Sequence, residues 1–131
     1  MMTLRPFKMD DLRKLKPQSR HAPHKHVILS KPEEFAYMEG PDSYTLEEGD
    51  KIRCCVGMYN GGWIWAFMAD DIGSAGLLRA TKMIKQKMIE KRRVYFATAL
   101  YEQGIRWVKL LGFRHLRGNN WICAPFMNQP H

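Results

Sequence analysis

Long apolar stretches are missing from this sequence, and their absence excludes a membrane-spanning protein. No window reaches the roughly 20 consecutive apolar residues that a transmembrane helix needs. The opening stretch, MMTLRPFKMDD, also lacks the apolar core of a signal peptide. We therefore expect a chain that begins where its gene begins, has no membrane partner and resides in the cytoplasm.

Cysteines are few, and none of them forms a CxxC pair. The three are Cys54, Cys55 and Cys123. Neighbouring residues of a strand point to opposite faces, so Cys54 and Cys55 would not readily pair with each other. Scattered cysteines in apolar surroundings favour buried, reduced thiols. We expect no disulfide and no metal site built on them.

Acidic residues are too few to balance the basic ones. The chain has 21 Lys and Arg against 13 Asp and Glu, a formal net charge of +8. This excess favours an anionic partner, which includes nucleic acid, a phosphorylated cofactor and an acidic protein surface. A basic surface that serves only solubility is the alternative. The length of 131 residues and the apolar fraction of 45% predict one packed domain over residues 1–131.

Apolar periodicity predicts strands and helices in a mixed order. The expected strands cover residues 3–7, 44–47, 52–59, 63–68, 93–98, 113–116 and 121–126. The expected helices cover residues 9–16, about 75–91 and 99–111, and a short helix that begins near Ser30, where Ser-x-x-Glu fits a capping box, and ends at Gly40-Pro41. The run of residues 17–26 is polar, basic and punctuated by prolines, and it predicts a surface loop.

The segment of residues 63–98 decides the fold class. It is expected to run strand, helix, strand, which gives a right-handed parallel crossover within a sheet otherwise built from hairpins. One such hairpin is expected at Asn60-Gly61-Gly62. Residues 63–68 are apolar on both faces, as in a central strand covered on both sides. We predict an α/β fold (an α+β mixed sheet) of about seven strands with helices on both faces.

Three stretches of the sequence resemble a known superfamily. The opening LRPFKMDDL is similar to the first strand and helix of the GNAT superfamily of N-acetyltransferases. Residues 63–91 occupy the place of its strand, pyrophosphate loop and helix, and YEQGIRWVKLLGF resembles its late helix with a terminal Gly-Phe pair. Within that last stretch, the residues IRWVKLLGF resemble even more closely the GNAT-like proteins of short-tailed phages, which include a family of small internal virion proteins. The resemblance covers nearly the whole chain.

The resemblance implies an acyl-CoA site at the turn into the helix of residues 75–91. The superfamily's loop places Arg or Gln first and small residues after it; here Asp70 takes the first position and Asp71 follows. Two carboxylates repel a phosphate, and the cations Arg79 and Lys82 are expected to offset them. The implied cofactor-binding residues are Gly73, Ser74, Ala75, Gly76 and Arg79. A plain helix start, with acids favouring the helix dipole, is the alternative interpretation.

The residue types expected for catalysis are largely missing. Counting back from Gly112-Phe113, the superfamily's thiolate-protonating tyrosine falls on Val108, and its companion asparagine falls on Tyr101. Tyr101 is therefore the candidate acid, with a core aromatic as the alternative. Glu47 and Glu48 are candidates for a base acting through water, or are solvated turn acids.

Three histidines, His21, His24 and His26, cluster as H-x-x-H-x-H. The cluster has no cysteine or carboxylate nearby to complete a metal set, so we expect a mobile basic loop and no metal.

Three functions follow from these features. The leading hypothesis is a phage-encoded GNAT-fold protein with a degraded catalytic motif, serving in virion assembly or inside the virion. Its basic clusters in residues 5–26 and 79–93 would contact phage structural proteins or the DNA backbone. The alternative is an active N-acetyltransferase that moves an acetyl group from acetyl-CoA to an unknown amine. A third hypothesis, a protein that binds one bacterial target, fits the length equally well.

Overall fold

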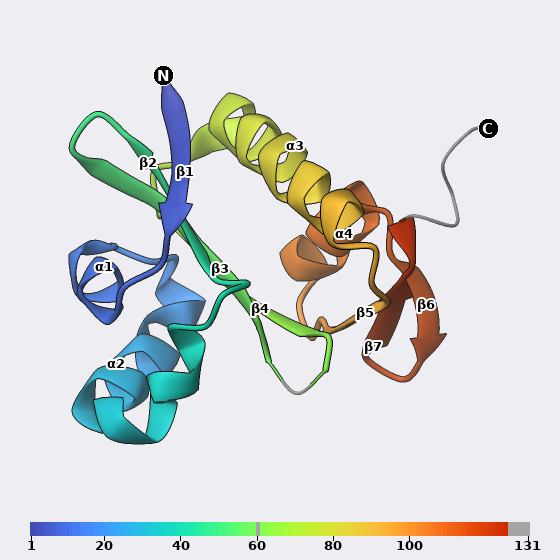
Figure 1. Cartoon of the computed structure of the whole chain (residues 1–131), viewed down its shortest axis with the longest axis horizontal. Helices are drawn as coiled ribbons and strands as arrows, with labels where there is room; N and C mark the ends of the chain where they lie inside the picture. Colours follow the sequence, from blue (N-terminus) through green and yellow to red (C-terminus); the bar gives the residue numbers. More distant parts are fainter. Residues whose placement is uncertain (60, 126–131) are drawn as a thin grey trace. The chain divides into compact units, whose positions relative to one another are not determined.

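The computed structural model describes residues 1–59 and 61–125, and Figure 1 shows its strands and helices. The strands are β1 (Met2–Pro6), β2 (Tyr44–Glu48), β3 (Lys51–Tyr59), β4 (Trp63–Met68), β5 (Tyr95–Thr98), β6 (Arg114–Arg117) and β7 (Asn120–Cys123). The α-helices are α1 (Met9–Lys14), α2 (Ala22–Ser30), α3 (Gly73–Lys91) and α4 (Glu102–Leu111), and the 3-10 helices are η1 (Ser19–His21) and η2 (Pro32–Met38).

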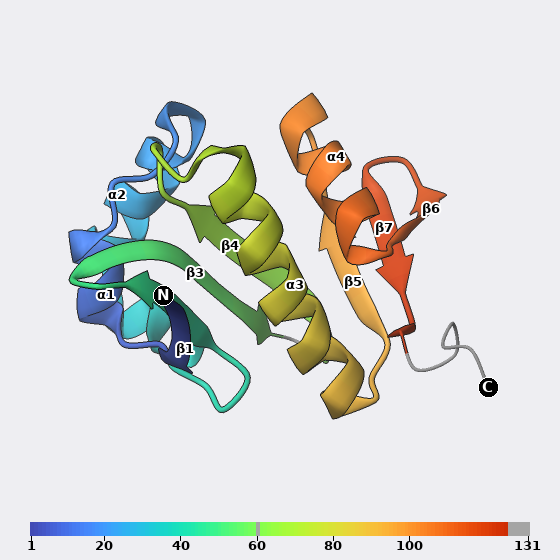
Figure 2. The same cartoon turned by 90° about the horizontal axis from the view of Figure 1, so that it is seen from above.

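The strands form one seven-stranded sheet in the order β1-β2-β3-β4-β5-β7-β6. β4 and β5 pair in parallel, with Trp63 opposite Phe96, and α3 connects them. β5 and β7, which Figure 2 shows side by side, pair antiparallel, as do β1 and β2, β2 and β3, and β6 and β7. The parallel crossover expected from residues 63–98 is therefore confirmed, and with it the mixed α/β fold class.

Contacts between residues divide the chain into two compact units, each described here by itself. The first comprises residues 1–59 and 65–80; the second comprises residues 61–64 and the chain from residue 81 onward. A single domain over residues 1–131 stays a prediction.

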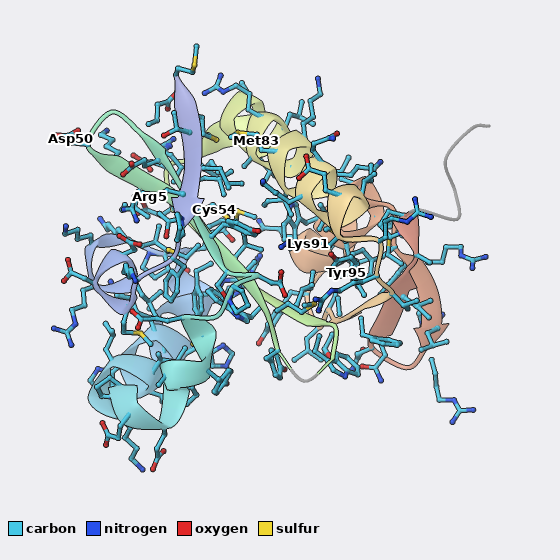
Figure 3. All side chains as sticks on the ribbon, viewed as in Figure 1. Arg5, Asp50, Cys54, Met83, Lys91 and Tyr95 are labelled. Atoms are coloured by element: carbon cyan, nitrogen blue, oxygen red, sulfur yellow. The ribbon has the colours of Figure 1, made fainter. Side chains whose placement is uncertain are left out.

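Two short elements at the start of the first unit are joined by a buried carboxylate. Asp11, in the first turn of α1, is only 3% exposed. It accepts hydrogen bonds from the Arg5 guanidinium on β1, from the backbone N–H of Lys8, and from the Thr45 hydroxyl on β2. Figure 3 labels Arg5 on β1, above the ribbon of α1. Because a buried charge must be paired, this network fixes how β1 leads into α1.

Three thiols lie in the cores of the two units. Cys54 and Cys55 on β3 are fully buried in the first unit, and Cys123 on β7 is buried in the second. Burial raises the pKa of Cys55 to about 12 and that of Cys54 well above its usual range. The expectation of buried thiols is confirmed.

The second unit is organised around the end of α4. Gly112 adopts a left-handed conformation (φ 99°) as its C-cap, and the Phe113 N–H reaches back to the Val108 carbonyl at 2.9 Å. Glycine takes this conformation without the steric cost that a Cβ imposes. Val108 and Leu111 in α4 and Phe113 directly after the cap are all buried. The predicted helix end at Gly112 is confirmed.

Two predictions for residues 17–40 are wrong. Residues 17–26 do not form a loop: from Ser19 onward they form the 3-10 helix η1 and the first part of α2, in which a proline occupies the first turn. Proline is tolerated there because that N–H has no intrahelical partner in any case. Ser30 is not the cap of a new helix: it ends α2, and its hydroxyl donates to the Val27 carbonyl at 2.7 Å. Lys31 precedes η2 and makes no side-chain cap.

Some helices and strands begin or end a few residues away from their predicted bounds. α1 ends at Lys14, β5 begins at Tyr95, and α4 begins at Glu102. Trp63–Met68 forms β4 as predicted and is central in the strand order, but its first four residues are only half-buried. In the expected hairpin, Gly61 and Gly62 have positive φ; Asn60 lies outside the described residues, as does Phe126, the predicted end of the last strand.

Candidate functional site

The turn from β4 into α3 is tied down by backbone hydrogen bonds within the first unit. The Ala69 N–H donates to the Arg53 carbonyl at 2.9 Å, and the Asp70 N–H donates to the Lys16 carbonyl at 2.8 Å. Pro17 also forms an isolated bridge with Ala69. The start of the 19-residue helix α3 is therefore fixed by both β3 and the segment after α1.

Small residues form the first turn of α3. Gly73 has a φ of +69°, a left-handed conformation that a side chain rarely adopts, and nothing lies within 4 Å of where its Cβ would be. Gly76 is buried, and a Cβ there would lie 3.1 Å from the Ile72 side chain. Ser74 and Ala75 are exposed between them. The first N–H groups of a helix have no carbonyl partner within the helix. This turn therefore offers backbone N–H donors that are surrounded by small side chains.

The two acids before α3 are paired with cations. Asp70 lies 3.6 Å from the Lys16 ammonium. Asp71 accepts a hydrogen bond from Arg53 at 3.1 Å and lies 3.9 Å from the Lys51 ammonium. Arg79, which was expected with Lys82 to offset these acids, forms its ion pair with Glu48 at 3.1 Å.

Arg53 is the residue at this turn that the sequence analysis missed. Its side chain is only 9% exposed, and its two terminal nitrogens donate to the carboxylate and the carbonyl of Asp71, each at 3.1 Å. The guanidinium also lies 3.9 Å from where a Cβ of Gly76 would be. An arginine within the otherwise apolar run ICCV was the available signal, since a buried cation needs a partner.

A cavity of about 240 Å³ opens beside this turn. It is built entirely from residues of the first unit. Figure 3 labels one of them, Asp50, at the tip of the β2–β3 hairpin. Its lining consists of Lys14, Lys16, Asp50, Lys51, Ile52, Arg53, Ala69, Asp70 and Asp71. The cavity thus lies directly before the first turn of α3.

The candidate catalytic residues are distributed over both units. In the second unit, Tyr101 is the residue before α4 and is 55% exposed, whereas Val108 is buried. In the first unit, Glu47 pairs with Arg5 at 3.1 Å, and Glu48 pairs with Arg79. The predicted catalytic role of Tyr101 stays a prediction, as do the cofactor-binding roles of Gly73 to Gly76 and Arg79.

The histidine cluster lies on η1 and α2. His21 is half-buried, and its ring meets that of Phe67 edge-on at 5.7 Å between centroids. Burial, followed by the charges of Arg20 and His24, lowers the pKa of His21. Within residues 1–59 and 61–125, no group of three or more His, Cys, Asp or Glu residues is placed to hold a metal ion. None of the helices in that described part is both long and apolar enough to span a membrane.

The strand order β1-β2-β3-β4-β5-β7-β6, with its parallel β4–β5 crossover, matches the GNAT-like acetyltransferase fold. Two solved structures share it, both of a tyrosine-to-phenylalanine mutant of the AtaT toxin. One holds the C-terminus of the antitoxin AtaR; at 14% identity and a TM-score of 0.59, it aligns over 100% of this chain and 99% of its own. The other holds the C-terminus of AtaR and acetyl-CoA; at 14% identity and a TM-score of 0.55, it aligns over 95% of this chain and 94% of its own.

No protein-family model matches the sequence, and no curated protein matches it. At 14% identity the likeness to AtaT shows the fold alone. Membership of the GNAT superfamily therefore stays a prediction, as does the resemblance to phage virion proteins.

Proposed function

We propose that this chain binds acetyl-CoA at the first turn of α3 and transfers the acetyl group to an amine. The observation that carries the proposal is the parallel β4–α3–β5 crossover, with a left-handed Gly73 at the start of a long helix. A solved structure that shares this fold over nearly its whole length contains acetyl-CoA, which supports the choice of cofactor.

The chemistry of the turn suits a pyrophosphate. Backbone N–H groups and the helix dipole at a helix N-terminus favour a bound anion, whatever the side chains are. Gly73, Ser74, Ala75 and Gly76 allow the phosphates to approach the backbone closely. The negative charges of Asp70 and Asp71, which would oppose binding, are balanced by Lys16, Lys51 and Arg53.

The transfer requires one bond to form and one to break. The amine nitrogen attacks the thioester carbonyl carbon, the C–S bond breaks, and the departing thiolate takes a proton while the amine loses one. We assign the acid to Tyr101, because Val108 has no proton to give. Glu47 and Glu48 are both held in ion pairs with arginines, so either would act as base only through an intervening water.

Calorimetry with acetyl-CoA tests the binding step. Gly73→Glu places a carboxylate and a strained backbone at the proposed phosphate site, and it should abolish binding. Gly118→Glu is the matched control, because Gly118 also has a positive φ (56°) and open space at its Cβ, but lies in the β6–β7 turn. Micromolar binding that Gly118→Glu keeps and Gly73→Glu loses is the expected result. Equal affinities of the two variants would refute the site.

The virion role and the contact with DNA or phage structural proteins predicted from the sequence stay predictions. No contact, distance or charge in the described residues adds support to them beyond the basic composition.

A further inference from the structure

The cavity before α3 has four cations in its lining. Lys14, Lys16, Lys51 and Arg53 face three carboxylates, those of Asp50, Asp70 and Asp71. Its volume of about 240 Å³ leaves room for a small anion with bound water, since one water occupies roughly 30 Å³ in the liquid. The proposed acetyl transfer uses neither this space nor the lysines around it as a binding group.

Arg53 is the cation at this cavity that is withdrawn from solvent. Its side chain is 9% exposed, whereas the Asp71 side chain that it binds is 59% exposed. Its Nε has no hydrogen-bond acceptor, because the nearest carboxylate oxygen, of Glu48, lies 3.7 Å away. Burying a guanidinium is costly, and the partly exposed carboxylates of Asp71 and Glu48 compensate for it only in part.

The Asp71 carboxylate occupies the position that an external anion would take. A guanidinium presents the same fork of N–H groups to a carboxylate and to a phosphate, so the two compete for it. Asp71 is exposed and can turn toward solvent, whereas Arg53 is also held by the Asp71 carbonyl at 3.1 Å and stays in place. Lys16 and Lys51 also line the cavity and are exposed, and their ammonium groups lie 3.6 Å from Asp70 and 3.9 Å from Asp71.

We propose that this cavity binds a phosphate monoester, with Arg53 as the principal ligand and Asp71 as an internal anion that the phosphate displaces. Asp71 then sets the affinity of the site: it keeps Arg53 paired when the site is empty and leaves when a dianion arrives. The site relies on the Arg53 side chain and not on the backbone donors of α3, so phosphate binding can be tested without acetyl-CoA.

Inorganic phosphate is the probe for the first experiment. Titration calorimetry of the full chain should show saturable binding, and Asp71→Asn should tighten it roughly five- to tenfold by removing the competing charge. Glu33→Gln is the matched control: it raises the net charge by the same amount, is exposed, and lies outside the cavity lining. Lys51→Met should weaken binding about threefold. No binding by Asp71→Asn, or equal affinities of Asp71→Asn and Glu33→Gln, would overturn the proposal.

A second titration distinguishes the source of the phosphate. If the group is the 3′-phosphate of CoA, acetyl-CoA should bind more tightly than its 3′-dephospho form, and Lys51→Met should remove the difference. If acetyl-CoA and its 3′-dephospho form bind with equal affinity, and Asp71→Asn still tightens the binding of phosphate, the site serves a separate phosphorylated ligand. Failure of both cofactors to bind would refute the proposed acetyl transfer and leave the phosphate titration as an independent test of this site.

Discussion

The Arg5 guanidinium binds the Asp11 carboxylate through two parallel hydrogen bonds, of 2.8 and 2.7 Å. The same carboxylate accepts the Lys8 N–H at 2.9 Å and the Thr45 hydroxyl at 2.8 Å. One side chain therefore connects β1, the start of α1 and β2, all of which precede the proposed site in the chain. A bidentate arginine–carboxylate pair with two further donors is among the stronger polar arrangements in proteins.

Replacing Asp11 with Asn should destabilise the chain by about 3 kcal/mol, because it leaves Arg5 and the Thr45 hydroxyl with incomplete partners. The neighbouring Asp10 provides the control. Its side chain is 64% exposed and pairs only with Lys14, so Asp10→Asn should cost less than about 0.5 kcal/mol. Urea unfolding of the wild type, Asp11→Asn and Asp10→Asn measures both losses of stability. Similar losses for the two variants would contradict the stabilising role of the Asp11 network.

Stability should also fall in acid because of Asp11. Burial alone would raise the pKa of Asp11, but hydrogen bonds from Arg5, Lys8 and Thr45 outweigh it, and the pKa is lowered from 3.8. A carboxyl with a depressed pKa stabilises the fold fully above its ordinary value and loses that contribution as the pH falls through the folded value. The stability difference between wild type and Asp11→Asn should therefore be constant near neutrality and shrink below about pH 4. A difference independent of pH down to pH 2 would refute this assignment.

The strands and the two long helices could be predicted because their apolar periods are clear. The crossover of residues 63–98 is confirmed for that reason, and the end of α4 is confirmed because Gly112 takes the left-handed conformation that ends a helix. The α2 helix could not be predicted, because its polar residues and Pro23 are also typical of a loop when the tertiary contacts are unknown. Its Lys25 ammonium donates to the Arg13 and Leu15 carbonyls at the end of α1, an arrangement that no local pattern indicates.

The candidate site was predicted in part. Small residues at Gly73 and Gly76 indicated the turn, and the structure places both in the first turn of α3. The charge balance could not be derived from sequence, because Arg53 and Lys51 reach Asp71 from β3, about twenty residues earlier in the chain. Arg79 was the nearer cation in sequence, but its partner is Glu48.

A methyl group at Gly57 should be poorly tolerated. A Cβ there would lie 2.4 Å from the Ser43 hydroxyl and 2.5 Å from the Trp65 ring, and Ser43 is buried. Gly57→Ala should therefore destabilise the chain by about 3 kcal/mol. Gly104→Ala is the control, because Gly104 lies in α4 and a Cβ there would meet nothing closer than the Ala99 Cβ at 3.8 Å. It should stabilise the chain by about 0.5–1 kcal/mol. Thermal unfolding of the two variants and the wild type measures these changes in stability. If Gly57→Ala were as stable as the wild type, β3 and β4 would be less tightly packed at Gly57.

Tyr101→Phe should separate binding from transfer. If Tyr101 protonates the thiolate, the variant should keep its affinity for acetyl-CoA and release CoA roughly 10²- to 10⁴-fold more slowly. The measurement is the appearance of free CoA thiol from acetyl-CoA in the presence of a mixture of primary amines. Tyr37→Phe, which removes another exposed hydroxyl, serves as control. Equal rates for the two variants would exclude Tyr101 as the acid.

The central claim is that backbone N–H groups at the start of α3 bind acetyl-CoA, and amide hydrogen exchange measures those groups directly. On saturation with acetyl-CoA, exchange should slow in residues 70–80 and stay unchanged in residues 30–42. Slowed exchange confined to the start of α3 is the predicted result. Binding that leaves the exchange of residues 70–80 unaltered would contradict the account.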